Sequence, residues 1–205
     1  MQISALGPIY GVILAGGQAR RMGGGDKGLR LLGGRPILGH VIDRLQPQLA
    51  GLVLNANGDP ARFARFNLPV VADSLADQPG PLAGILAGLD WLAVAHPAAR
   101  WLVSVPGDCP FLPLDLAAEL ATVLAPSNQA ATARYQGRLQ PVCGLWSVGL
   151  RADLRQAVAV DGMRRVEDWV QRCGAVAVDF PEAAIDPFFN VNSPADLERA
   201  AALLG

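Results

Sequence analysis

Residues 8–28 read PIYGVILAGGQARRMGGGDKG, and this stretch decides the fold class. Its first part, Ile9 to Ala15, is short, apolar and followed by a glycine pair, which predicts a buried strand that ends in a loop. Its second part, from Leu14 to Gly28, holds six glycines and three cationic side chains in fifteen residues. Glycine lets backbone N–H groups approach a ligand closely, and consecutive N–H groups that turn inward bind anions. The stretch therefore predicts a strand followed by an anion-binding loop.

Positive charge is concentrated around this loop. Between positions 20 and 35 one acid, Asp26, opposes five cations, namely Arg20, Arg21, Lys27, Arg30 and Arg35. The local excess of +4 contrasts with a net charge of −1 for the whole chain. Bare amides together with positive charge favour phosphate as the ligand. The structural alternative is a surface loop with solvated arginines, and for Arg30 and Arg35 we expect that solvated role.

Two common phosphate-binding motifs fit this loop poorly. A Walker motif requires Ser or Thr after its lysine, but Gly28 follows Lys27. Gly23, Gly25 and Gly28 satisfy the dinucleotide pattern G-x-G-x-x-G. These glycines lie eight residues beyond the strand and have a lysine among them, so the match is weak.

Composition limits the class of protein. The chain has 205 residues, of which 51% are apolar and 17% charged, so we expect one compact domain over residues 1–205. It has neither the basic excess of a general nucleic-acid binder nor an apolar run of membrane-spanning length. Three irregularly spaced cysteines argue against a zinc knuckle and a disulfide framework, and no signal peptide is evident. These features predict a cytoplasmic protein that acts on neither membranes nor nucleic acids.

The remaining pattern alternates strands with helices. Strands are predicted at 9–15, 52–54, 69–72 and 101–105, and helices at 38–49, 82–92 and 116–124. This order predicts an α/β fold, a Rossmann-like three-layer sandwich with a mostly parallel sheet and helices on both faces. Farther on we expect a hairpin of strands 131–135 and 139–146, with an edge or bulge at Pro141. Two helices at 150–158 and 163–170 and a strand at 175–180 should follow. A last helix should begin at Ser193-Pro194.

Polar residues follow several predicted strands. Asp108 comes just after strand 101–105, at the carboxyl edge where open α/β sheets bind ligands, and a carboxylate suits Mg²⁺. Asp73 follows strand 69–72. The structural alternatives are that both acids cap turns or helices, and that Asn55, which follows strand 52–54, belongs to a turn.

The loop LAGGQARRMGGGDKG resembles the LAGG-x-x-x-R-M-G-x-x-K signature of a nucleotidyltransferase superfamily. Within it, the chain most closely resembles the molybdenum cofactor guanylyltransferases. The further pieces that carry this resemblance are LNAN (54–57), VVADSLADQPGPLAGI (70–85), VPGDCPFLP (105–113), LQPVCGLW (139–146) and FNVNSPADL (189–197). They occur in the family's order and cover essentially the whole chain.

The resemblance implies a fold of the nucleotide-diphospho-sugar transferase type and transfer of GMP from GTP to the terminal phosphate of molybdopterin, with release of pyrophosphate. It implies catalytic roles for Lys27, Asp108 and Arg21, with Asp108 holding Mg²⁺, or Mn²⁺ as a possible substitute. It also implies that Asn190 and Asn192 bind the pterin. The GTP-binding residues that it implies are Leu14, Ala15, Gly16, Gly17, Gly24, Lys27, Asn55, Asp73, Gly80, Gly84 and Asp108.

Several of these roles have structural alternatives. Gly80 and Gly84 could instead serve a turn and close helix packing. Asn190 and Asn192 alternate along a segment expected to be extended, so their amides can point the same way, but they could equally satisfy backbone groups at a strand end.

Other functions stay open on the sequence alone. The same chemistry could serve a molybdopterin cytidylyltransferase or a sugar-phosphate nucleotidyltransferase. A dinucleotide-dependent oxidoreductase would need an acid near the end of the second strand, where this chain has Asn55. A non-catalytic nucleotide-binding or carrier protein would have less need of Asp108. The resemblance further implies GTP and molybdopterin as substrates, and transient contacts with cofactor-assembly proteins and acceptor molybdoenzymes.

Overall fold

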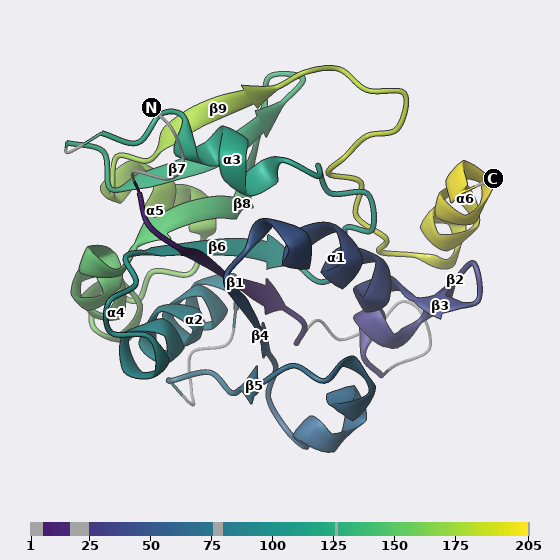
Figure 1. The fold of residues 1–205 in the computed structure, drawn as a ribbon, viewed down its shortest axis with the longest axis horizontal. Coiled ribbons are helices and arrows are strands. Elements are labelled where there is room, and N and C mark those ends of the chain that lie inside the picture. The colour runs from purple at the N-terminus through teal and green to yellow at the C-terminus, as the bar shows by residue number, and fades with distance from the viewer. Residues whose placement is uncertain (1–5, 17–24, 76–79, 126, 205) are drawn as a thin grey trace.

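The computed structural model describes residues 6–16, 25–75, 80–125 and 127–204. A seven-stranded sheet, in the order β5-β4-β1-β6-β8-β7-β9, runs through its centre (Figure 1). Within this sheet β8 alone runs antiparallel to its neighbours, so the predicted mostly parallel sheet is confirmed. The strands are β1 (Ile9–Leu14), β4 (Gly51–Asn55), β5 (Val70–Val71), β6 (Trp101–Pro106), β7 (Ala130–Tyr135), β8 (Arg138–Ser147) and β9 (Val176–Phe180).

Helices cover both faces of the sheet. Successive strand residues point to opposite sides, and both sides carry apolar residues that the helices bury. On β1, Ile13 packs with α1 (Ile37–Leu45) and α3 (Leu116–Ala121) in one apolar cluster. The neighbouring Val12 packs with the second set of helices in another cluster. That set is α2 (Pro81–Ala95), α4 (Arg151–Ala159) and α5 (Val166–Arg172). The predicted three-layer sandwich is therefore confirmed.

The order of the strands creates a crevice at the centre of the sheet. From β1 the chain passes through α1 to β4 on one side, and from β5 it returns through α2 to β6 on the other. Ligands of open α/β sheets bind where the strand order reverses, outside the carboxyl ends of the strands. Asp108, two residues after β6, lies at this point, as the sequence predicts.

Several local features were not foreseen from the sequence, and those near the cleft matter most here. The short strands β2 (Leu31–Leu32) and β3 (Arg35–Pro36) pair with each other, and the 3₁₀ helix η5 (Pro60–Phe66) follows β4. Segments this short have too little periodicity to be predicted. Residues 188–192, expected to be extended, belong to no strand; instead the Val191 N–H donates to the Asp108 carbonyl at 3.0 Å.

The C-terminal helix α6 (Pro194–Leu204) lies apart from the sheet (Figure 1). Its Ala200 joins Leu32, Ile37 and Val191 in a small separate apolar cluster. Ser193 caps this helix as predicted: its hydroxyl accepts from Asp196 N at 3.2 Å and donates to the Asp196 carboxylate at 2.8 Å. The described residues contain no helix that is both long and apolar enough to cross a membrane.

Candidate active site

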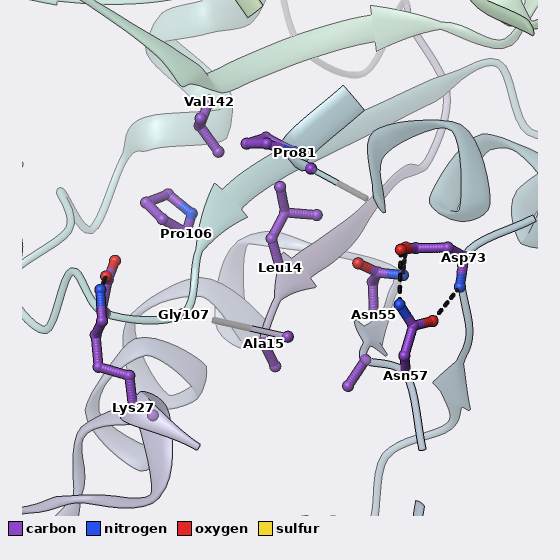
Figure 2. A pocket seen from close by; sticks show the side chains of 15 residues that line it. Leu14, Ala15, Lys27, Asn55, Asn57, Asp73, Pro81, Pro106, Gly107 and Val142 are labelled. Atoms are coloured by element: carbon purple, nitrogen blue, oxygen red, sulfur yellow. Dashed lines mark hydrogen bonds and ion pairs between the residues drawn. The ribbon is translucent and has the colours of Figure 1, made fainter. Parts of the chain in front are cut away.

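A cleft of about 280 Å³ opens at the carboxyl ends of β1, β4 and β6 (Figure 2). Two polar groups of side chains lie at its ends, with apolar side chains between them. The predicted GTP ligands that line the cleft are Leu14, Ala15, Gly16, Lys27, Asn55, Asp73, Gly80 and Asp108. Gly17, Arg21 and Gly24, predicted from the same loop, lie outside the described residues.

Lys27 lies at one end of the cleft and joins three segments of the chain. Its ammonium group donates to Asp108 Oδ2 at 2.8 Å and to Asn192 Oδ1 at 2.6 Å. The side chains of Lys27 and Asp108 are each only 16% exposed, so water screens this ion pair less than a surface pair. Two predicted catalytic residues and one predicted pterin ligand therefore meet at one point.

The absence of a side chain at Gly28 allows Lys27 to reach Asp108. A Cβ at Gly28 would lie 3.2 Å from the Gly107 carbonyl oxygen and 3.3 Å from Leu38 Cβ. A side chain there would push the turn that carries Lys27 away from the loop after β6. The glycine that breaks the Walker motif is thus the residue that lets this turn pack closely against Gly107 and Leu38.

Asn55, Asn57 and Asp73 form the polar group at the other end (Figure 2). The Asn55 amide donates to Asp73 Oδ1 at 2.9 Å, and the Asn57 amide donates to Asp73 Oδ2 at 2.8 Å. The backbone N–H of Asp73 donates in turn to Asn57 Oδ1 at 2.9 Å. Two strand ends, those of β4 and β5, therefore fix one carboxylate at the cleft. Sequence reasoning gave Asn57 no role, although it belongs to the quoted LNAN piece.

Gly84 lies behind this group and is absent from the residues that line the described cleft. A Cβ at Gly84 would approach Asn55 Oδ1 to 2.3 Å and Leu14 Cδ2 to 2.8 Å. Glycine here allows α2 to pack closely on Asn55, so the geometry favours the close-packing alternative for this residue. Gly80, by contrast, precedes the first residue of α2 and lines the cleft directly.

Between the polar ends, Leu14, Pro81, Pro106 and Val142 form an apolar wall (Figure 2). Val142 comes from a bulge in β8: Thr132 pairs with Gly144 and Ala133 with Gln140, so residues 141–143 have no partner on β7. The sequence predicted an edge or bulge at Pro141, and the bulge is confirmed.

Buried hydroxyl groups stabilise this bulge. Ser104 donates to the Val142 carbonyl at 2.6 Å and accepts from Trp146 Nε1 at 2.8 Å. Thr132 donates to the Gln140 carbonyl at 3.2 Å. Ser104 and Thr132 are both fully buried, where an unpaired carbonyl would be costly. These hydroxyls therefore hold Val142 at the wall of the cleft, a role for which the sequence gave no signal.

Asn190 contacts a different group from Asn192. The Cys109 thiol donates to Asn190 Oδ1 at 3.1 Å, and the Asn190 amide nitrogen donates to the Phe188 carbonyl at 3.2 Å. Burial raises the pKa of Cys109 well above its ordinary value, and the nearby Cys143 and Asp108 raise it further. Cys109 therefore stays a protonated hydrogen-bond donor at neutral pH and is not activated as a nucleophile.

Comparison with known proteins decides the family. A family model described as the MobA-like NTP transferase domain matches residues 11–176. The chain belongs to this family. It is 53% identical over 193 residues to the molybdenum cofactor guanylyltransferase of Rhodopseudomonas palustris strain HaA2, covering 94% of this chain and 90% of that protein. The resemblance drawn from the ordered sequence pieces is confirmed, and the chain is a nucleotidyltransferase.

Solved structures share the fold of this MobA-like chain. Molybdopterin-guanine dinucleotide biosynthesis protein A from Archaeoglobus fulgidus superposes with a TM-score of 0.72 at 21% identity, covering 95% of this chain and 98% of that one. A Mycobacterium tuberculosis H37Rv protein in complex with manganese superposes with a TM-score of 0.67 at 20% identity, covering 95% and 98%. At these identities the likeness establishes the nucleotidyltransferase fold and no more.

Proposed function

We propose that the cleft binds GTP with its guanine at the Asn55–Asp73 end and its triphosphate at the Lys27 end. The protein transfers GMP to the terminal phosphate of molybdopterin, which forms molybdopterin guanine dinucleotide and releases pyrophosphate. Relatives named for guanylyl transfer at about half identity over nearly the full chain support the reaction. The observation that carries the placement is the contact of Lys27 with both Asp108 and Asn192.

The carboxylate of Asp73 supports guanine as the base. Guanine presents two N–H donor groups side by side on its pairing edge, and an ionised carboxylate accepts hydrogen bonds without donating any. Cytosine presents mainly acceptors on the same edge. Because the amides of Asn55 and Asn57 fix the carboxylate, it is already oriented before a nucleotide binds.

For this reaction the protein must align the two substrates and neutralise the negative charge of their phosphates. The attacking phosphate of molybdopterin is already an anion, so no side chain has to remove a proton from it. The oxygen of that phosphate forms a bond to the α-phosphorus of GTP while the bond to pyrophosphate breaks. Lys27 stabilises the negative charge that gathers on the phosphates, as cationic groups do in other phosphoryl-type transfers.

The residues near Asp108 fit a divalent ion of the Mg²⁺ type. Among the described residues no three His, Cys, Asp or Glu side chains form a metal cage, so an ion here would take few protein ligands. Mg²⁺ commonly binds in this way, through one or two carboxylates together with substrate phosphates and waters. We propose Asp108 as the ligand of Mg²⁺, with Mn²⁺ as a substitute; when bound, the ion neutralises phosphate charge.

We propose Asn192 and Asn190 as contacts of the pterin substrate. The carbonyl oxygen of the Asn192 amide accepts from Lys27, so its NH₂ group is the part that would reach the acceptor. Asn190 accepts a hydrogen bond from Cys109, the residue that follows Asp108 in the loop after β6. Contacts with cofactor-assembly proteins and acceptor molybdoenzymes are part of the proposal, although we assign no residues to them.

A substrate panel tests the proposed function. GTP, CTP, ATP and NAD are offered in turn with molybdopterin and Mg²⁺, and pyrophosphate and the nucleotide–pterin product are measured. We expect both products with GTP and little of either with the other nucleotides. Equal or better turnover with CTP would assign the chain to cytidylyl transfer instead, and binding of GTP without any product would support a carrier.

A further inference from the structure

Arg62 is an additional side chain that connects the two ends of the cleft. It belongs to η5, the 3₁₀ helix after β4, and neither the sequence motifs nor the proposed reaction gives it a role. Its side chain is only 26% exposed, so most of this charged side chain is shielded from water. A partly buried cation near a phosphate-binding site calls for an explanation.

The guanidinium group contacts residues next to both ends. Its Nε lies 2.7 Å from Asp26 Oδ2, and the Asp26 side chain is 19% exposed. Its Nη2 donates to the backbone carbonyl of Asn57, and its Nη1 donates to that of Asp59. The guanidinium carbon also lies 4.6 Å from the ring centre of Phe63, which is fully buried.

The partners of Arg62 are close in the chain to the proposed GTP contacts. Asp26 directly precedes Lys27 and is the one acid among the five cations of residues 20–35. Asn57 holds the carboxylate of Asp73 at the other end. One side chain thus links the turn that carries the phosphate-binding lysine to the residues that hold the base-recognising acid.

We propose that Arg62 is a positioning residue for GTP, which acts by neutralising Asp26 and by fixing the Lys27 turn relative to Asn57. The inference rests on the proposed function. Without Arg62, the Asp26 carboxylate would keep an uncompensated negative charge beside the site of a triphosphate. That charge would repel the nucleotide and would compete with it for the ammonium group of Lys27.

The test uses Arg62→Met, which keeps an unbranched apolar stem over Phe63 and removes the charge. Calorimetric titration with GTP should show a dissociation constant raised about tenfold, the order expected for one uncompensated charge near a polyanion. Added salt should reduce the defect only in part, because the Asp26 carboxylate is mostly buried and is screened less than a surface charge. Turnover at saturating GTP should change much less than the dissociation constant.

Removing the partner charge separates this role from a merely structural one. In the Arg62→Met background, Asp26→Asn should restore GTP affinity to within about threefold of the parent, because the repelling carboxylate is gone. Arg62→Lys should lie between parent and Arg62→Met, since it keeps the charge without the fork of donors. The matched control is Arg65→Met, an exposed arginine on the same short helix, which should bind GTP like the parent.

Two results would overturn the inference while leaving the proposed function intact. One is an Arg62→Met protein that binds GTP as tightly as the parent. The other is a loss of GTP affinity that Asp26→Asn does not restore and that accompanies a loss of thermal stability. That result would show that Arg62 only packs against its neighbours. A parent that binds no GTP would instead overturn the proposed function, and the inference with it.

Discussion

Lys27 contacts partners that are far away in the sequence. Asp108 lies 81 positions from it and Asn192 lies 165 positions from it. The sequence indicated each of these residues separately: Lys27 from the glycine-rich loop, Asp108 from the end of a strand, and Asn192 from the family resemblance. It could not show that one ammonium group bonds to both partners, because that contact depends on how the loop after β6 and the segment before α6 pack together.

We expect Lys27→Ala and Asp108→Ala each to lower GMP transfer by about 10²-fold or more, the usual effect of removing a pre-oriented group that stabilises charge in a reaction. The rate of pyrophosphate release from GTP and molybdopterin measures this. Arg35→Ala is the control, because Arg35 forms an exposed ion pair with Asp43. Turnover within twofold of the parent would remove the mutated residue from the mechanism.

Asp73→Asn tests how the base is selected. An amide of the same shape replaces one acceptor oxygen with a donor, so it should pair poorly with the two N–H groups of guanine. We expect GTP to bind at least about tenfold more weakly, and the parent's preference for GTP over inosine triphosphate, which lacks the guanine amino group, to disappear. Competition binding with the two nucleotides measures both effects, and an unchanged preference would place the base elsewhere.

Asn192→Ala should weaken use of molybdopterin and leave GTP affinity nearly intact, because its NH₂ group is assigned to the acceptor. Steady-state kinetics with varied molybdopterin, beside calorimetric titration with GTP, separates the two substrates. A loss of GTP affinity with unchanged molybdopterin kinetics would show that Asn192 serves only to hold Lys27.

At the scale of elements, the helices and strands with clear periodicity were predictable and the short ones were not. The central strands and α2 follow from apolar runs bounded by Gly, Pro and Asn. The pair β2–β3 and η5 were missed, and with η5 the position of Arg62. Pro141 was the only sign of the β8 bulge in the sequence. The hydroxyl groups that hold the bulge come from other strands, β6 and β7, so the sequence of β8 does not show them.

Ser104→Ala tests the bulge as an element. The substitution leaves the Val142 carbonyl and Trp146 Nε1 without their partner, and Trp146 is fully buried. We expect the free energy of unfolding in urea to fall by about 1–3 kcal/mol, the cost of unpaired buried polar groups. Ser127→Ala, at an exposed serine, is the control. Equal stability of the two variants would show that Ser104 does not hold the bulge.

At the scale of the whole molecule, the buried thiols link stability to pH. Burial is the main cause that raises the pKa of Cys109, of Cys143 and, to about 11, of Cys173. A thiol in the unfolded chain loses its proton near pH 8.5, whereas the folded protein keeps it. The unfolded state then binds fewer protons, so stability must fall as the pH rises above about 8.5.

The slope that each fully buried thiol contributes should grow through this range toward about 1.4 kcal/mol per pH unit. Urea unfolding of the parent and of Cys109→Ser between pH 7.5 and 10 measures it. The variant starts less stable, yet its curve should be flatter by about one thiol's slope. Parallel curves would show that the Cys109 thiol ionises in the folded protein as readily as in the unfolded chain.

The central claim is that one cleft holds guanine at Asp73 and triphosphate at Lys27, with a divalent ion on Asp108. The most direct measurement is a crystal structure of the protein soaked with GTP and Mg²⁺. We predict phosphate oxygens within hydrogen-bonding distance of the Lys27 ammonium, an ion beside Asp108, and the guanine edge on the Asp73 carboxylate. A polyphosphate bound far from Lys27, with no ion beside Asp108, would contradict it.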